Sequence, residues 1–166
     1  ATIWRIVKPV VQDPLEAEWS NVSASIAEQL AKRDELRESA KTIKDTKKFV
    51  QVRTRANERQ REAQALFSGF LEKLRQFKIL DPACGSGNFL YLSLKALKDL
   101  EHKVNLDAET LGLQRQHDVT GPHNVLGIEI NEYASELARI TVWIGELQWR
   151  SQHGYAFKTN PVLEPL

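Results

Sequence analysis

The residues with the clearest chemical potential lie between Asp81 and Asn88, where the chain reads Asp-Pro-Ala-Cys-Gly-Ser-Gly-Asn. Gly85 and Gly87 can adopt backbone conformations that other residues avoid, and without a Cβ they let a ligand lie against the backbone. A helical pattern starts directly after them, so the unpaired N–H groups of its first turn would point to the same place. Together with the Asp81 carboxylate, this turn predicts a nucleotide-binding site.

A second carboxylate, Glu129, follows a short apolar run over residues 125–128. At the carboxyl end of a strand, such a side chain can accept hydrogen bonds from both hydroxyls of a ribose. The alternative role is a helix cap, because a helical pattern follows, but Asn131 suits that role better. We therefore expect Glu129 to bind the ribose of a ligand.

Two strands position these groups. Residues 77–80 and 125–128 are short apolar runs that each end near an acidic residue, and the chain between them is long enough for a crossover helix and a loop. This arrangement predicts two parallel strands whose carboxyl ends lie together. Helical periodicity is found over residues 3–10, 15–38, 63–74, 89–100 and 134–147. The fold class predicted is α/β.

The full string from Asp81 to Leu90 resembles motif I of the S-adenosylmethionine-dependent DNA methyltransferases, in the branch that methylates adenine N6. Gly-Ile-Glu-Ile-Asn-Glu-Tyr-Ala, beginning at Gly127, resembles motif II of the same family. Within this family, the chain is similar to proteins in which modification and restriction lie on one long polypeptide, and to phage-defence methylases. A dinucleotide site is disfavoured, because the third glycine of that pattern is replaced by Leu90.

The resemblance implies S-adenosylmethionine as the cofactor and DNA as the partner, bound through the full-length protein. It also implies part of a Rossmann-like methyltransferase sheet with a helical amino-terminal extension, and a specificity or endonuclease domain on the same polypeptide. The cofactor residues it implies are Asp81 for the methionine amino group and Glu129 for the ribose. The remaining ones form the backbone cradle and two apolar walls: Ala83, Cys84, Gly85, Ser86, Gly87, Asn88, Phe89 and Ile130.

No catalytic residue is predicted. Methyltransferases of this kind use an Asn/Asp/Ser-Pro-Pro-aromatic tetrad, in which the ring stacks on a flipped base. The nearest string, Asn160-Pro161-Val162-Leu163, lacks the second proline and the aromatic residue. The chain contains no methionine, which indicates a fragment of a longer protein. We expect this fragment to hold the cofactor-binding part and to be inactive alone.

We expect two regions: a helical extension over residues 1–62 and a truncated cofactor-binding domain over residues 63–166. Between Ala31 and Arg61 the chain is highly charged, with a basic excess that continues to the end of this stretch. Contact with a DNA backbone is one interpretation, because that contact needs only a row of cations. A solvated hairpin and a poorly ordered loop are the alternatives for residues 31–62.

Composition restricts the other function classes. The net charge is +1, which by itself indicates nothing about nucleic acid. The single cysteine, Cys84, excludes a disulfide framework, and the four histidines are too scattered to suggest a metal site. No apolar run reaches the length of a membrane span, so a cytoplasmic protein is expected. A non-catalytic α/β interaction or specificity module, and a methyltransferase acting on protein or RNA, remain as alternative functions.

Overall fold

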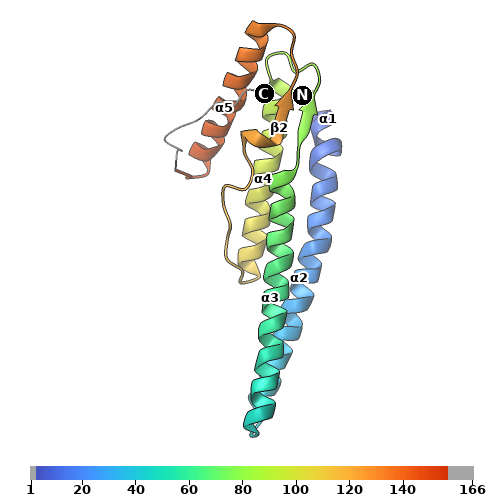
Figure 1. Cartoon of the computed structure of the whole chain (residues 1–166), viewed down its shortest axis with the longest axis vertical. Helices are drawn as coiled ribbons and strands as arrows, with labels where there is room; N and C mark the ends of the chain where they lie inside the picture. Colours follow the sequence, from blue (N-terminus) through green and yellow to red (C-terminus); the bar gives the residue numbers. More distant parts are fainter. Residues whose placement is uncertain (1–2, 157–166) are drawn as a thin grey trace.

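The computed structural model describes residues 3–156, and most of them are helical. The elements follow in the order α1 (Trp4–Val7), the π-helix η1 (Lys8–Gln12), α2 (Asp13–Ala40), α3 (Thr46–Gln76), β1 (Ile79–Asp81), α4 (Asn88–Thr110), the 3-10 helix η2 (Pro122–Asn124), β2 (Val125–Gly127) and α5 (Glu132–Gln152). Figure 1 shows a long hairpin of α2 and α3, with α5 and the two strands gathered near one of its ends and α4 running alongside α3.

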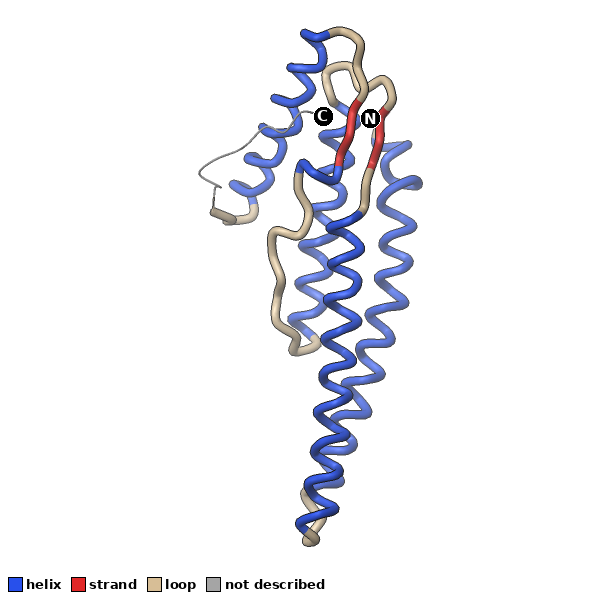
Figure 2. Tube along the Cα trace, in the orientation of Figure 1, coloured by secondary structure: helices blue, strands red, loops and turns tan. Residues whose placement is uncertain are grey.

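The amino-terminal helix is continuous through α1, η1 and α2 (Figure 2). Pro9 and Pro14 do not end this helix, although proline commonly breaks a helix. Each proline lacks a backbone N–H, and the turn that includes Pro9 is a π-helix in which the Asp13 N–H bonds to the Lys8 carbonyl. The helical amino-terminal region that we predicted is therefore present.

Helix α2 packs along α3 through an aromatic contact near the strand end of the hairpin. The ring centroid of Trp19 lies 5.1 Å from that of Phe70 and 6.4 Å from that of Phe67. The Trp19 indole N–H donates a hydrogen bond to Asp107 of α4 at 2.7 Å, which satisfies the one polar atom of this buried side chain. Trp19 is thus a core residue.

Helix α4 lies at the centre of the core. Its apolar residues recur every three or four positions and are buried against the amino-terminal helix, α3, α5 and both strands: Leu90, Leu94, Leu97, Leu100, Val104 and Ala108. This helix begins at the glycine turn, so the packing of its apolar face holds the turn in place. Trp149 of α5 is also buried.

The predicted fold class, α/β with part of a Rossmann-like sheet, is wrong, because the described residues are mostly helical. β1 and β2 pair in parallel, with Ile79 opposite Val125, but each strand has three residues and the residues described form no Rossmann-like sheet. Ile79 and Val125 are buried on one face, whereas Leu80 and Leu126 of the other face are 56% and 38% exposed. Parallel sheets are normally covered on both faces. The strand-turn-helix pattern specifies these two strands but contains nothing that specifies further strands beside them.

Residues 31–62 form the end of α2, a short turn and the first part of α3. Asp45 caps α3 by accepting a hydrogen bond from the Lys48 N–H at 2.9 Å. Helix α3 runs without a break across residues 62 and 63, where we predicted the boundary between the extension and the cofactor-binding domain. The loop 111–121 connects α4 to η2.

Candidate functional site

The two acidic strand ends lie together, as the parallel pairing requires. Asp81 stands opposite Gly127 in the ladder, and the Ile128 N–H donates to the Asp81 carbonyl at 2.9 Å. The pairing continues past both strands, because the Cys84 N–H donates to the Ile128 carbonyl at 3.0 Å. The glycine turn after β1 is therefore fastened to the stretch after β2 by backbone hydrogen bonds.

The turn requires both of its glycines, for different reasons. Gly85 has φ +53° and Gly87 has φ +84°, and both values lie in the left-handed region that favours glycine. A Cβ on Gly87 would lie 2.8 Å from the Ala138 Cα of α5, so this glycine also permits a close approach of the two segments. A Cβ on Gly85 would meet no atom within 4 Å. The space beside Gly85 is open, which a ligand lying against the backbone requires.

Glu129 bridges the glycine turn and the start of α5. Its carboxylate accepts one hydrogen bond from the Gly85 N–H and one from the Asn131 N–H, both at 2.9 Å. These two bonds favour the charged form and lower the pKa of Glu129. Each carboxylate oxygen has two lone-pair directions, so both can still accept a hydrogen bond from a ligand hydroxyl.

Asp81 and Asn131 also act on neighbouring backbone. The Asp81 carboxylate accepts a hydrogen bond from the Ala83 N–H at 3.1 Å, which shapes the start of the turn. Asn131 caps α5 by accepting a hydrogen bond from the Ala134 N–H at 3.1 Å. The capping role thus belongs to Asn131, which the sequence favoured for it, and Glu129 is directed to the glycine turn.

The amino terminus of α4 has no side-chain cap within the described residues, because its N-cap residue is Gly87. The first N–H groups of a helix have no acceptor within the helix, and they carry partial positive charge. Ser86 and Asn88 are exposed beside this end, where the Asn88 amide donates to the Ser86 hydroxyl at 3.4 Å. The turn therefore presents backbone donors, and Glu129 presents acceptors.

Cys84 is a buried residue of the turn. Burial raises the pKa of its thiol, and the nearby charges of Asp81 and Glu129 raise it further. A Cβ on Gly127 would lie 2.6 Å from the Cys84 Sγ, so the thiol fills the space that this glycine leaves. A packed thiol with a raised pKa is poorly suited to act as a nucleophile.

The two predicted apolar walls occupy different surroundings. Phe89 is half-buried and packs against the hydrophobic core. Ile130 is 98% exposed and packs against nothing in the described part of the chain. The structure thus brings together the turn from Ala83 to Asn88, Asp81 and Glu129, while Ile130 lies outside this group. The string at Asn160 lies outside the described residues.

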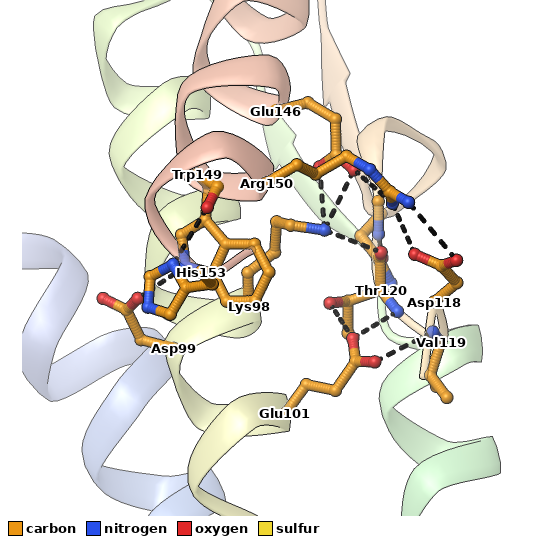
Figure 3. A network of polar contacts seen from close by, with 12 residues as sticks. Lys98, Asp99, Glu101, Asp118, Val119, Thr120, Glu146, Trp149, Arg150 and His153 are labelled. Atoms are coloured by element: carbon orange, nitrogen blue, oxygen red, sulfur yellow. Dashed lines mark hydrogen bonds and ion pairs between the residues drawn. The ribbon is translucent and has the colours of Figure 1, made fainter. Parts of the chain in front are cut away.

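A buried charged network lies further along α4 and α5 (Figure 3). Lys98, 2% exposed, places its Nζ 2.9 Å from the Glu146 Oε2, and Arg150 pairs with both Glu146 and Asp118. The Glu101 carboxylate accepts hydrogen bonds from the Val119 and Thr120 N–H groups at 3.0 and 2.8 Å, which are drawn as dashed lines in Figure 3. The network holds α5 and the loop 111–121 against α4.

The sequence analysis missed this network, since lysine and glutamate in a helix normally face solvent. A usable indication existed: Lys98, Glu101 and Asn105 fall at helical spacing from Leu94, on the apolar stripe of α4. Charged residues on such a stripe must be paired where they are buried.

No helix in the part of the chain that the structure describes is long and apolar enough to cross a membrane.

Comparison with protein families identifies one match over most of the chain. The family described as "MmeI, DNA-methyltransferase domain" matches residues 54–166, which include the glycine turn, Glu129 and the helices between and after them. The match begins within α3, so it includes most of that helix but not α2. No solved structure matches the chain.

Two curated proteins are similar to about half of the chain. DNA methyltransferase A of Bacillus subtilis (strain 168) is 34% identical over 83 residues, which cover 49% of this chain and 9% of that protein. A putative type II restriction enzyme and methyltransferase of Methanocaldococcus jannaschii is 30% identical over 88 residues, or 52% of this chain and 8% of that protein. The chain therefore spans less than a tenth of the length of either relative.

Proposed function

The chain belongs to the DNA-methyltransferase domain family of MmeI, and from this premise we propose that its glycine turn and Glu129 bind S-adenosylmethionine. The longer protein would transfer a methyl group to adenine N6 in DNA within a restriction–modification or phage-defence system. The observation that carries the proposal is the position of Glu129: its carboxylate is hydrogen-bonded to the Gly85 N–H, beside an open turn and an uncapped helix end.

The described residues fit this cofactor. The open space at Gly85 admits a ligand against the backbone, where a side chain would block it. Glu129 offers acceptors for the two ribose hydroxyls, and the N–H groups at the start of α4 offer donors. Asp81, in the same loop, offers a carboxylate for the methionine amino group. We assign the cradle to residues 83–88, and we retain Phe89 and Ile130 as proposed apolar contacts.

The bound cofactor would supply an activated methyl group on a sulfonium. The residues of this chain bind and orient that group, and we assign none of them to the methyl transfer itself. Such transfer to an amino group of a base requires the base to be turned out of the duplex into an active site. We propose that this part of the reaction depends on segments of the longer protein, so that the chain alone binds the cofactor without methylating DNA.

The partners of the longer protein follow from the same proposal. DNA is the substrate, and the name of the Methanocaldococcus jannaschii relative, which joins restriction enzyme and methyltransferase, supports an endonuclease on the same polypeptide. A DNA-modifying role would place the protein in the cytoplasm. We also propose residues 63–166 as the cofactor-binding part of the chain and residues 1–62 as its helical extension.

Calorimetric titration of the chain with S-adenosylmethionine tests the proposal. We expect the unaltered chain to bind, and we expect Glu129→Gln to weaken binding at least about tenfold, since charge-assisted hydrogen bonds to the ribose are lost. Glu132→Gln is the matched control, because Glu132 is an exposed acid three residues further on. Binding that is equal in Glu129→Gln and the unaltered chain would contradict the role of Glu129.

A second pair of variants tests the turn. Gly85→Val would fill the open space beside the backbone and should abolish binding. Gly112→Val is its control, because Gly112 also has a positive φ of +78° and open space around it but lies at the end of α4. No binding by the folded, unaltered chain would favour the alternative of a non-catalytic interaction module.

A further inference from the structure

The end of the α2–α3 hairpin is a narrow projection that we call the hairpin tip, defined as residues 37–55. Figure 1 shows it extending past the lower end of α4, at the opposite end of the molecule from the strands and the glycine turn. The hydrophobic core does not reach the tip. The core residues nearest to it are Leu30 of α2 and Ala63 of α3, and Ala40 is the only buried residue of the tip. The tip is held by two helices alone.

The tip concentrates the positive charge of the chain. It contains seven lysines and arginines and two acidic residues, whereas the rest of the chain contains sixteen basic and twenty acidic residues. All seven cations are exposed: Arg37, Lys41, Lys44, Lys47, Lys48, Arg53 and Arg55. Like charges repel one another in a compact structure, so folding of the hairpin does not explain this excess.

The acidic residues of the tip are already engaged. Glu38 pairs with Lys41 at 2.6 Å, and Asp45 is the cap of α3. Within the described residues, six of the cations form no ion pair: Arg37, Lys44, Lys47, Lys48, Arg53, which lies over the Phe49 ring, and Arg55. Nearer the body of the molecule the pattern changes, because Arg59 pairs with Glu62 at 2.7 Å and bonds to Gln29 of the facing helix. Beyond the tip, Glu58 and Glu62 accompany Arg59 and Arg61, so the excess of positive charge ends with the tip.

Two of these cations share one face of α3, while Arg37 lies on α2 and Lys44 lies in the turn between the helices. Lys48 and Arg55 are seven residues apart, about two turns or 10 Å along α3, and lie on nearly the same side of it. Duplex DNA carries one negative charge for about every 1.7 Å of its axis, so two cations at this spacing can each meet a phosphate, and the other exposed cations of the tip lie near them in the chain. Contacts of this kind position a protein on DNA without reading its sequence.

We propose that the hairpin tip binds the sugar-phosphate backbone of duplex DNA and so anchors the protein beside its target. This inference rests on the proposed function and adds a contact surface to it. From its first residue in the tip to its last residue before β1, α3 has 31 residues and spans about 45 Å at a rise of 1.5 Å per residue. The tip thus contacts phosphates on the order of a dozen base pairs away from the base beside the glycine turn.

The test is the binding of a fluorescently labelled duplex of arbitrary sequence to the full chain, followed by anisotropy. The tip variant replaces Lys44, Lys47, Lys48 and Arg55 with glutamine. The control variant removes the same number and kind of exposed cations elsewhere, by the changes Lys8→Gln, Lys73→Gln, Arg75→Gln and Lys103→Gln. Circular dichroism and the calorimetric titration with S-adenosylmethionine are measured on both variants.

We expect the tip variant to bind DNA at least about tenfold more weakly than the control variant at low salt. The slope of log affinity against log salt concentration should fall by up to roughly 0.9 for each phosphate contact removed. Equal losses in the two variants, or no DNA binding by the unaltered chain, would overturn the inference, as would preferential binding of polyglutamate, which indicates an acidic protein partner. Cofactor binding should be unchanged in the tip variant, so failure of the proposed function is seen separately.

Discussion

The carboxylate of Glu129 accepts a hydrogen bond from the backbone N–H of Gly85 at 2.9 Å, although the two residues are 44 positions apart in the chain. This bond joins the two stretches that carry the chemistry of the molecule. It exists because β1 and β2 are parallel neighbours, with Asp81 opposite Gly127, so that both chain segments leave the sheet at the same edge. It also makes the ionisation of Glu129 part of the stability of the turn.

Replacement of Glu129 by glutamine should destabilise the chain only where the carboxylate is charged. Hydrogen bonds from the N–H groups of Asn131 and Gly85 lower the pKa of Glu129. A lowered folded-state pKa contributes stability above the unfolded pKa of about 4.3, and this contribution is lost as the pH falls through the folded-state value. Thermal unfolding of both proteins from acid to neutral pH measures it: the difference in Tm should be constant at neutral pH and shrink in acid. A pH-independent difference would argue against an ionised Glu129 in these bonds.

Replacement of Gly87 by alanine should cost more stability than replacement of Gly112. Both residues have positive φ, so each change strains the backbone by about 1–2 kcal/mol. Only at Gly87 would the new Cβ also meet another segment, 2.8 Å from the Ala138 Cα. We expect about 3 kcal/mol or more for Gly87→Ala, measured by urea unfolding. Equal losses for the two variants would show that α5 does not pack against the turn in this way.

Two other glycines are predicted to respond in opposite directions. A Cβ on Gly127 would lie 2.6 Å from the Cys84 Sγ and 2.8 Å from the Leu90 Cδ1, so Gly127→Ala should destabilise by about 2 kcal/mol. Gly69 lies within α3 with open space around it, and Gly69→Ala should stabilise by about 0.5–1 kcal/mol. Both values can be read from the midpoints of urea unfolding. A neutral Gly127→Ala would mean that the thiol does not occupy this space.

Loss of the buried ammonium of Lys98 should be one of the most damaging single changes. Lys98→Met leaves the Glu146 carboxylate with the more distant Arg150 as its remaining partner, and breaking a buried pair costs about 3 kcal/mol or more. Lys95→Met is the control, because Lys95 pairs with Asp99 at the surface of the same helix. A pair of that kind is worth about 0.5 kcal/mol. If Lys98→Met lost no more stability than Lys95→Met, the pair of Lys98 and Glu146 would be exposed to solvent.

The sequence by itself determined the local structure of the site. Glycines followed by a helical apolar pattern specify a turn and a helix start, and Asn131 specifies the start of α5, because these effects depend only on residues a few positions apart. Periodicity likewise located α2, α4 and α5, but it located α3 only over residues 63–74, because the first part of that helix is highly charged. The motifs from Asp81 and from Gly127 were also sufficient to indicate the family that the comparison then identified.

Only the tertiary structure decided how many strands pair and which charges are buried. The sheet is limited to two short strands, since pairing is a contact between distant segments and a local strand pattern does not count its neighbours. Lys98 and Glu146 are 48 residues apart, and their burial follows from the packing of α5 on α4. For the same reason, the direction of Glu129 toward Gly85 was decided by the fold: a side chain 44 residues away supplies a partner that no local pattern contains.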